Sequence, residues 1–494
     1  MGMLSSLKDA VSGQSNNLES NETGSSTNSY GLLIGGELVQ TGETLDVINP
    51  ATEEIFTSVP LAGAGELEAA VAAATTAAKN FKSTSIEERQ ALIKKIVKAM
   101  GAHKEELALA LVQEQGKSLD MARLEVDFSM GFAMHFTTVG LPIEVLLETD
   151  AQRVEIHRKP LGVVAGITAW NFPLLMAAYK LAPAILAGNA IILKPAPTTP
   201  VSTVMLGEII KDIVPPGLVS ILVDNNELGA KITSHPGIAK ISFTGSIATG
   251  KKVMASGADT LKRVTLELGG NDAGIVLDAA DPKAMAQNLF NVAFMNSGQV
   301  CIALKRLYVH DSIYDAICDE MAVLAKGAIV GDGMKDGTQF GPVQNKQQFE
   351  IIKGFIEDAK ANGNIIAGGQ VPDIPGYFIP LTVVRDISDG TKLVDEEPFG
   401  PILPIIKFSD IDEVIERSNR LDYGLGGSVW SSDVDKAVKV AEKMDTGTVW
   451  INSHMAFGPN IPFPPCKQSG VGVEWGKEGL NEFTSMQVIN IAKG

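Results

Sequence analysis

One cysteine of this chain stands in a setting that favours reactivity. Cys301 closes the segment Phe294-Met-Asn-Ser-Gly-Gln-Val-Cys301, just after a Gly-Gln turn, in a chain with only three cysteines. A thiolate is the strongest nucleophile that a side chain offers near neutral pH, and it attacks carbonyl carbons to form covalent intermediates. A free cysteine is also commonly a small buried hydrophobic residue. Taken alone, Cys301 leaves both interpretations open.

Two further polar side chains follow apolar runs that we expect to be strands. Glu267 lies in Leu266-Glu-Leu-Gly-Gly270, where burial would raise its pKa and suit a general base. Asn171 lies in Trp170-Asn-Phe-Pro173, and its amide can stabilise an oxyanion without carrying charge. The alternatives are a partly exposed glutamate at a turn, and an asparagine that caps a helix or forms an Asx turn.

A glycine-containing turn after a third apolar run is suited to binding phosphate. Phe243-Thr-Gly-Ser-Ile-Ala-Thr-Gly250 ends an expected strand and opens an expected helix, where backbone N–H groups and the helix dipole can hold a pyrophosphate. Gly245 through Lys251 also begins like the P-loop of a nucleotide hydrolase, but Lys252 stands where a Mg²⁺-binding hydroxyl is needed. A turn without any ligand is the remaining alternative.

These residues need strands to position them, and the sequence predicts two series. The first alternates five short apolar runs with amphipathic helical stretches, which favours a doubly wound parallel sheet that binds nucleotides at the carboxyl ends of its strands. The second series follows Asn271 and has longer helices, charged on one face. The expected strands are 163–168, 190–194, 219–223, 239–243 and 263–268, then 307–310, 402–408, 427–430 and 448–452. The expected long helices are 314–326, 347–361 and 434–444.

Two segments stand apart from both series. Residues 144–148 and 154–158 read as a hairpin, and residues 486–492 as a terminal strand. A hairpin with nothing of its own to pack on indicates pairing with another subunit. The predicted fold class is therefore α/β, with two doubly wound Rossmann-like αβ domains plus a small β oligomerisation element.

Composition limits the function classes. A length of 494 residues implies two or three domains. The net charge of −17 argues against nucleic-acid and anionic-membrane partners. An odd cysteine count gives no disulfide framework, so we expect a reducing compartment, the cytoplasm. Residues 1–29 are rich in Ser, Asn and Gly and are predicted to be a disordered extension without a secretory signal. No metal site is predicted.

Read together, the motifs resemble the aldehyde dehydrogenase superfamily over nearly the whole chain from about Gly31. The motifs occur in that family's order and spacing: Trp170-Asn-Phe-Pro, Lys194-Pro, Phe243-Thr-Gly-Ser, Leu266-Glu-Leu-Gly-Gly, Gly298-Gln-Val-Cys, Glu396-Glu-Pro-Phe-Gly-Pro401 and Lys467-Gln-Ser-Gly470. The resemblance implies an NAD(P)-binding domain over 30–140 and 160–268, a catalytic domain over 269–470 and an oligomerisation element over 141–159 and 477–494. It also implies a homodimer or homotetramer.

The resemblance assigns catalytic roles. Cys301 attacks an aldehyde to give a thiohemiacetal, with the oxyanion held by Asn171 and the backbone N–H of Cys301. Hydride transfer to nicotinamide leaves a thioester, which water activated by Glu267 hydrolyses to the acid. Lys180 and Glu474, in Gly472-Val-Glu-Trp-Gly476, match a lysine and an acid that relay the proton in some members; an exposed ion pair is the alternative.

Cofactor residues are carried over in the same way. Trp170, Lys194, Gly245 and Ser246 match the ribose and pyrophosphate contacts, and Glu397 with Phe399 matches the clamp on the nicotinamide ribose. Members strict for NAD usually carry a Glu three residues after the lysine, whereas this chain has Pro197. Proline supplies neither the hydrogen-bond acceptor nor the charge that repels a 2′-phosphate. The expected cofactor is therefore NAD, with NADP also accommodated.

The substrate tunnel implied by the resemblance is apolar. It would be lined by Met130, Phe172, Tyr179, Phe457 and Phe463, for which plain core packing is the alternative. Semialdehyde enzymes commonly have an Arg at the position of Tyr179, to pair with the substrate carboxylate. A second departure is Pro464-Pro-Cys466 where the family usually shows Gly-Gly, which stiffens that loop and makes Cys466 a second accessible thiol.

The sequence thus predicts an enzyme that oxidises an apolar, medium-chain or aromatic aldehyde to its acid with reduction of NAD(P). A semialdehyde dehydrogenase or a coenzyme A-acylating aldehyde dehydrogenase is the alternative within the family, although Glu267 favours hydrolysis. Outside it, a catalytically silent relative and a P-loop nucleotide hydrolase remain open.

Overall fold

The computed structural model describes residues 30–278 and 281–493, so the predicted extension over 1–29 lies outside the described residues. A six-stranded sheet forms the first αβ unit, in the order β19-β11-β10-β7-β8-β9. Strands β7 to β11 run parallel and β19 pairs antiparallel with β11. Their bounds are β7 Val163–Ile167, β8 Ala190–Lys194, β9 Val219–Ile221, β10 Lys240–Thr244, β11 Arg263–Glu267 and β19 Gly470–Val471.

Helices cover both faces of this sheet. The chain moves outward from β7 through β8 to β9, then crosses back to β10 and β11, so the strand order reverses between β7 and β10. Helices α6 and α7 pack on one face, and α2, α8 and α9 on the other. The bounds are α2 Ala64–Phe81, α6 Pro173–Ala187, α7 Val201–Ile210, α8 Leu228–Ser234 and α9 Ile247–Gly257. Such a reversal opens a crevice at the carboxyl ends of the strands.

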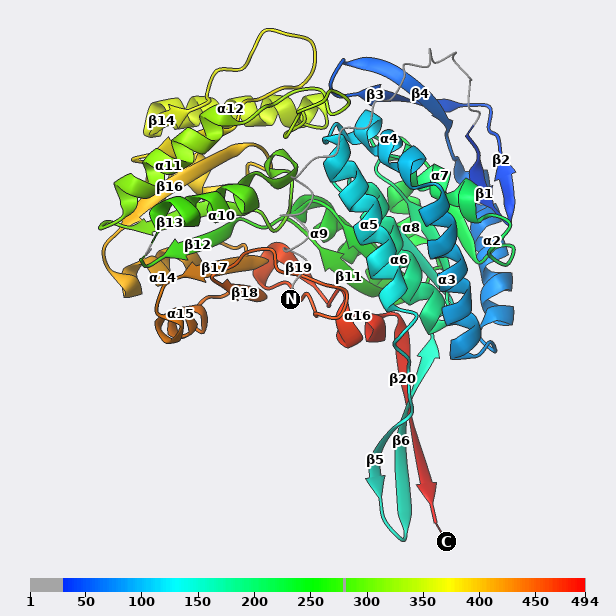
Figure 1. Cartoon of the computed structure of the whole chain (residues 1–494). Helices are drawn as coiled ribbons and strands as arrows, with labels where there is room; N and C mark the ends of the chain where they lie inside the picture. The colour runs from blue at the N-terminus through cyan, green and yellow to red at the C-terminus, as the bar shows by residue number, and fades with distance from the viewer. Residues whose placement is uncertain (1–29, 279–280, 494) are drawn as a thin grey trace.

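The N-terminal part adds small strands and three long helices to this unit. Helices α3, α4 and α5 pack around α6 and α7 (Figure 1). The bounds are β1 Leu32–Ile34, β2 Glu37–Val39, β3 Thr44–Asn49, β4 Glu54–Pro60, α3 Ile86–Ala102, α4 Lys104–Gln115 and α5 Leu119–His135. These helices were not predicted from the sequence.

A seven-stranded sheet forms the second αβ unit, in the order β14-β15-β16-β13-β12-β17-β18. All neighbours pair in parallel except β14 with β15. The strands are β12 Asp272–Val276, β13 Leu304–His310, β14 Asn364–Ala367, β15 Thr382–Arg385, β16 Ile402–Phe408, β17 Gly426–Trp430 and β18 Thr448–Ile451. The helices are α10 Pro282–Phe294, α11 Tyr314–Gly327, α12 Lys346–Asn362, α13 Lys392–Asp395, α14 Ile411–Asn419 and α15 Val434–Ala441.

A three-stranded antiparallel sheet projects from the body, in the order β20-β6-β5 (Figure 1). Its strands are β5 Glu144–Glu148, β6 Gln152–Pro160 and β20 Thr484–Ala492, and short helix α16 (Gly476–Glu482) precedes β20. Most side chains of β5 and β20 are exposed. The predicted hairpin and terminal strand are both present, and they pair with each other within one chain.

The two predicted series are confirmed as parallel sheets covered by helices, with strand ends within a few residues of those expected. Strands β12, β14, β15 and β19 of the two sheets were missed. No helix in residues 30–278 and 281–493 has both the length and the apolar character needed to cross a membrane.

Candidate active site

Eight of the predicted functional residues line one cavity with room of about 260 Å³, at the carboxyl ends of β7, β10 and β11. This is the edge at which the strand order of the first sheet reverses, and the second unit closes the cavity from the other side. The predicted residues that line it are Trp170, Asn171, Gly245, Ser246, Glu267, Cys301, Glu397 and Phe399.

The turn before Cys301 has an unusual backbone. Asn296, Ser297 and Gly298 all have positive φ, at 50°, 56° and 72°. Such angles are uncommon outside glycine and cost free energy unless the surroundings impose them. At Gly298 a Cβ atom would lie 2.2 Å from the carbonyl oxygen of Gly400, so this position also has no room for a side chain. The turn follows the end of α10 and places Cys301 in the lining of the cavity, where it is partly exposed.

Buried side-chain hydrogen bonds hold this turn. Asn296 Nδ2 donates to the carbonyl of Asn171 at 3.2 Å, and Ser297 Oγ donates to the carbonyl of Gly341 at 2.8 Å. Gln299 Nε2 donates back to the carbonyl of Asn296 at 3.0 Å. The strained conformation is therefore fixed by polar contacts from both αβ units, which keeps the thiol in one place.

Asn171 faces the cysteine turn rather than capping a helix. The N-cap of α6 is Phe172, which makes no side-chain cap hydrogen bond, and Asn171 is 2% exposed. Asn171 Nδ2 donates to the carbonyl of Gln299 at 2.9 Å. An amide nitrogen carries two hydrogens, so the second remains available to an oxygen in the cavity. The N-cap alternative for this residue is wrong.

A buried ion pair supports the main chain at Asn171. Lys117 and Glu125 form an ion pair in which both side chains are 0% exposed. Lys117 Nζ also donates to the carbonyl of Asn171 at 2.9 Å, and Glu125 accepts from the backbone N–H groups of Leu174 and Leu175 at the start of α6. The pair thus ties α5 to the first turn of α6. Neither residue was identified from the sequence.

Cys301 and Glu267 both line the cavity, and each affects the pKa of the other. Glu267 is 5% exposed, and burial raises its pKa to about 7, although the Cys301 thiol and the charge of Lys180 lower it. Burial and the charge of Glu267 raise the pKa of Cys301 well above its usual value, while Lys305 lowers it. Burial and Glu267 thus favour the protonated thiol, and Lys305 favours the thiolate.

Lys180 and Glu474 form a buried ion pair rather than an exposed one. Their side chains are 0% and 4% exposed, and Lys180 Nζ lies 3.1 Å from Glu474 Oε1. Ser242 joins them, accepting from Lys180 at 2.7 Å and donating to Glu474 at 3.0 Å. Both charges act on the pKa of Glu267. The exposed alternative is wrong.

The glycine-containing turn has the geometry expected for an anion site. Ser246 caps α9, its Oγ accepting from Thr249 N at 3.3 Å, and the helix N-terminus borders the cavity. Lys251, the lysine that a P-loop would aim at phosphate, is bound instead to Gln468 Oε1 at 2.7 Å near the surface. The turn therefore offers backbone N–H groups without a P-loop lysine.

Lys194 and Pro197 lie beside the cavity rather than in its lining. Lys194 is the last residue of β8, paired in register with Ile167 of β7. Its Nζ lies 2.5 Å from Asp224 Oδ1, and both residues are buried. An acidic group is thus present next to Lys194, but it comes from the loop after β9 instead of from position 197.

An aromatic cluster adjoins the cysteine side of the cavity. Trp475 is at its centre, with ring centroids 4.8 Å from Phe463, 5.2 Å from Phe132, 5.5 Å from Phe457 and 5.8 Å from Tyr179. Phe128 extends it beyond Phe457. Phe172 belongs to the same apolar core. Trp475, Phe132 and Phe128 were missed. Trp475 directly follows Glu474 in Gly472-Val-Glu-Trp-Gly476, so that motif could have indicated it.

Met130 lies outside this aromatic cluster, and its place in a substrate tunnel stays a prediction. Met130 packs in the core of the first unit, where its sulphur lies 3.5 Å from the Cβ position of Gly101 in α3. Phe128 and Phe132 are each two residues away on α5. A helix turns by about 100° per residue, so residues two apart point to nearly opposite sides.

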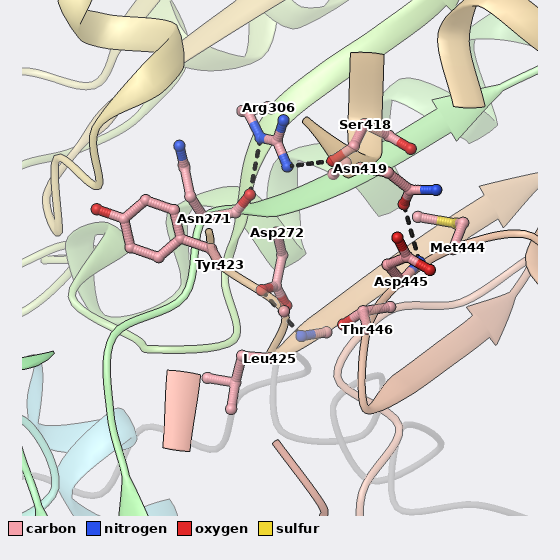
Figure 2. Close-up of a pocket in the computed structure, with 13 residues that line it drawn as sticks. Asn271, Asp272, Arg306, Ser418, Asn419, Tyr423, Leu425, Met444, Asp445 and Thr446 are labelled. Atoms are coloured by element: carbon pink, nitrogen blue, oxygen red, sulfur yellow. Dashed lines mark hydrogen bonds between the residues drawn. The ribbon is translucent and has the colours of Figure 1, made fainter. Parts of the chain in front are cut away.

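A second, smaller hollow lies at the start of β12, and none of the predicted site residues lines it (Figure 2). Arg306 spans it, Nε donating to the carbonyl of Asn271 at 2.8 Å and Nη2 to that of Ser418 at 3.0 Å. Asp272 accepts from Gly426 N at 3.1 Å. These bonds anchor the start of β12, and so fix the Gly269-Gly270 segment that borders the main cavity.

Comparison with known proteins gives consistent matches across the chain. A family model described as the aldehyde dehydrogenase family matches residues 38–489. Phenylacetaldehyde dehydrogenase from Pseudomonas fluorescens is 37% identical over 480 residues, 93% of this chain and 95% of that protein. The structure of a Bacillus cereus aldehyde dehydrogenase in complex with NAD⁺ superposes with a TM-score of 0.91 at 33% identity, covering 94% of this chain and 97% of that one. Betaine aldehyde dehydrogenase from Staphylococcus aureus in complex with NAD⁺ gives a TM-score of 0.89 at 32% identity, covering 94% and 95%.

Proposed function

Since this chain belongs to the aldehyde dehydrogenase family, we propose that it oxidises an apolar aldehyde, medium-chain or aromatic, to its carboxylic acid through Cys301, with reduction of NAD or NADP. The observation that carries this proposal is the meeting of Cys301, Asn171 and Glu267 in one cavity. This reaction needs a nucleophile, an uncharged hydrogen-bond donor and a general base whose pKa lies near the working pH.

The first step is attack by sulphur. A bond forms between Cys301 Sγ and the aldehyde carbon, the thiol proton passes to Glu267 in the same cavity, and the carbonyl electron pair moves to oxygen. The second hydrogen of Asn171 Nδ2 and the backbone N–H of Cys301 stabilise the oxyanion. Because the donor amide is already fixed by Gln299, little reorganisation accompanies the charge development.

The residues around the cavity fit a dinucleotide. When bound, NAD(P) accepts the hydrogen and electron pair that leave the aldehyde carbon. The N-terminus of α9 with Ser246 would hold the pyrophosphate, the Glu397 carboxylate would accept from ribose hydroxyls, and Trp170 with Phe399, whose rings lie 5.2 Å apart, would flank the ring end. Pro197 leaves no acid at the usual place, so we propose NAD with NADP also accommodated.

The last step is hydrolysis of the Cys301 thioester. Glu267, once it has passed its proton on, takes a proton from a water molecule as the oxygen attacks the acyl carbon, and the carbon–sulphur bond breaks to release the acid. A carboxylate with a pKa of about 7 is basic enough for this and is still largely ionised above that pH. We propose that the buried pair Lys180 and Glu474 relays the proton that Glu267 releases.

The aromatic cluster supports an apolar substrate. Tyr179, Phe457, Phe463 and Trp475 present ring faces and edges, which favour a medium-chain or aromatic aldehyde. Tyr179 Oη hydrogen-bonds to Thr244, a residue of the cavity lining, which connects the cluster to the cysteine side. Tyr179 stands where a semialdehyde enzyme would need a cation for its substrate carboxylate.

We further assign domains to these tasks. Residues 30–140 and 160–268 bind the cofactor, 269–470 carry the nucleophile, and 141–159 with 477–494 join subunits into a homodimer or homotetramer. The exposed apolar side chains of the three-stranded sheet support the last assignment.

The test is an assay of the purified protein with short, long, aromatic and carboxylated aldehydes, each with NAD and with NADP. We expect reduced cofactor with the apolar members and none with Cys301→Ser. Absence of activity with every aldehyde contradicts the proposal, as does full activity of Cys301→Ser. Activity that depends on added coenzyme A would favour the acylating alternative.

A further inference from the structure

Lys305 is a buried cation to which the sequence motifs give no role. It is the second residue of β13, and its side chain is 3% exposed. Lysine is almost never buried unless it is paired. The groups that its ammonium contacts therefore indicate its role.

The ammonium of Lys305 joins two parts of the active site. Nζ donates to the carbonyl of Cys301, and it lies 3.0 Å from Glu397 Oε1. The Glu397 carboxylate also accepts from Gly270 N at 3.3 Å, and it packs so tightly that a Cβ atom on Gly269 would lie 2.2 Å from Oε2. One cation thus connects the nucleophile's main chain to the carboxylate on the cofactor side.

We propose that Lys305 is a positioning residue that holds Glu397 and the main chain of Cys301 in one arrangement and places a positive charge beside the thiol. The inference rests on the function proposed above, in which Cys301 is the nucleophile and Glu397 a cofactor ligand. Two negative groups, Glu267 and Glu397, otherwise act on the thiol. A lysine that contacts Glu397 and the main chain of Cys301 offsets part of their field and favours formation of the thiolate.

The directions of these effects give the inference a signature. Burial, Glu267 and Glu397 raise the pKa of Cys301, whereas Lys305 lowers it. Burial likewise raises the pKa of Glu397, and Lys305 lowers it. Removal of Lys305 and removal of the Glu397 charge should therefore shift the thiol titration in opposite directions. The titratable and charged groups that act on Cys301 or Lys305 are Tyr179, Glu267, Asp272, Glu397 and His454.

The experiment measures alkylation of Cys301 by iodoacetamide as a function of pH, in the full chain without cofactor. A Cys466→Ser background removes the exposed thiol, and Cys318 is buried. The variants are Lys305→Met, Lys305→Arg, Glu397→Gln and the double variant Lys305→Met with Glu397→Gln. Thermal melting verifies that each is folded.

We expect Lys305→Met to raise the midpoint of the alkylation profile by about one pH unit, so that alkylation below the midpoint slows roughly tenfold. Lys305→Arg should stay near the parent, Glu397→Gln should lower the midpoint, and the double variant should lie between the two single variants. The double variant removes both charges together, so it tests the idea even where Lys305→Met alone does not fold.

An unchanged midpoint in folded Lys305→Met overturns the inference, and so do shifts of the same sign in Lys305→Met and Glu397→Gln. The alkylation measurement needs no turnover, so failure of this inference can be distinguished from failure of the proposed function. A protein that oxidises no aldehyde but shows the opposite shifts would refute the proposed function and keep the role of Lys305. A protein that oxidises an aldehyde but shows an unchanged midpoint in folded Lys305→Met would refute the role of Lys305 and keep the proposed function.

Discussion

At the scale of single residues, the ionisation of Glu267 controls the last step of the proposed reaction. Burial raises its pKa to about 7. A general base must be ionised, so thioester hydrolysis should fall about tenfold for each pH unit below that value and level off above it. Stopped-flow measurement of the burst of reduced cofactor, followed by the steady state, separates hydrolysis from the earlier steps.

Replacement of the base supplies the control for this pH dependence. Glu267→Gln should slow the burst, because Glu267 accepts the thiol proton in the first step, and should also slow the steady state by about 10²- to 10⁴-fold, with loss of the limb near pH 7. A variant with the parent's steady-state rate would show that another group activates the water.

Gly298 tests whether the strained turn is required. Alanine there would place its Cβ 2.2 Å from the carbonyl oxygen of Gly400 at a φ of 72°. We expect Gly298→Ala to lose most activity and about 1–3 kcal/mol of unfolding free energy, measured by denaturant titration alongside the assay. Gly65→Ala in α2 is the matched control, because nothing lies within 4 Å of its Cβ position. Equal stability of the two variants would contradict the argument.

Residue type and position in the sequence identified the candidate catalytic residues, but the sequence did not predict which side chains contact one another. Glu267 and Asn171 could be singled out because each follows an apolar run, and parallel strands bring their carboxyl ends to one edge. Cys301 could be singled out because it follows a Gly-Gln turn in a chain with only three cysteines. Lys305 pairs with Glu397 through tertiary structure alone, and a lysine four residues after a cysteine carries no periodic signal. Which residues of α5 face the aromatic cluster, Phe128 and Phe132 rather than Met130, depends on how that helix is rotated against α6.

At the scale of elements, strands with two buried faces were the most predictable. Ala190–Lys194 is apolar on both faces and was located to the residue, as parallel strands under helices require. Strand β12 was missed because it begins with Asp272, a buried carboxylate that the sequence alone does not mark as interior. The antiparallel pair β14 with β15 lies at a sheet edge, where alternation of apolar residues is weaker.

The connection between α5 and the start of α6 gives a prediction about stability. Lys117→Met leaves Glu125 buried without its partner, which should cost about 3–5 kcal/mol of unfolding free energy. The carbonyl of Asn171 also loses a donor, so activity should fall with stability. Denaturant unfolding of the purified variant measures the first effect.

A surface pair between α4 and α5 provides the comparison. Lys104 and Asp127 lie 2.7 Å apart with side chains 33% and 47% exposed, and exposed pairs contribute about 0–1 kcal/mol. Lys104→Met should therefore be close to the parent. If both lysine variants lose the same free energy, burial is not what makes the Lys117–Glu125 pair important.

At the scale of the whole molecule, the projecting sheet is the part that one chain leaves unpacked. Its strands carry exposed apolar side chains, including Leu146 at 60%, Val488 at 56% and Met486 at 53% exposure. Isolated two- or three-stranded sheets without a packed face are marginal in water, and contiguous exposed apolar surface marks interaction sites. This geometry supports pairing with a second copy, as the hairpin pattern in the sequence indicated.

The oligomer prediction follows from that surface and has a matched control. Leu146→Asp places a charge on the exposed face of β5 and should shift the protein towards monomer in analytical ultracentrifugation, without changing its far-ultraviolet circular dichroism. Leu261→Asp is the control, because Leu261 is 90% exposed in the first αβ unit, away from the sheet. Burial of Leu146 between subunits would make its carboxylate replacement costly, since an unpaired charge is strongly disfavoured away from water. A parent that is already monomeric, or a Leu146→Asp variant that sediments like the parent, would remove the sheet from the subunit interface.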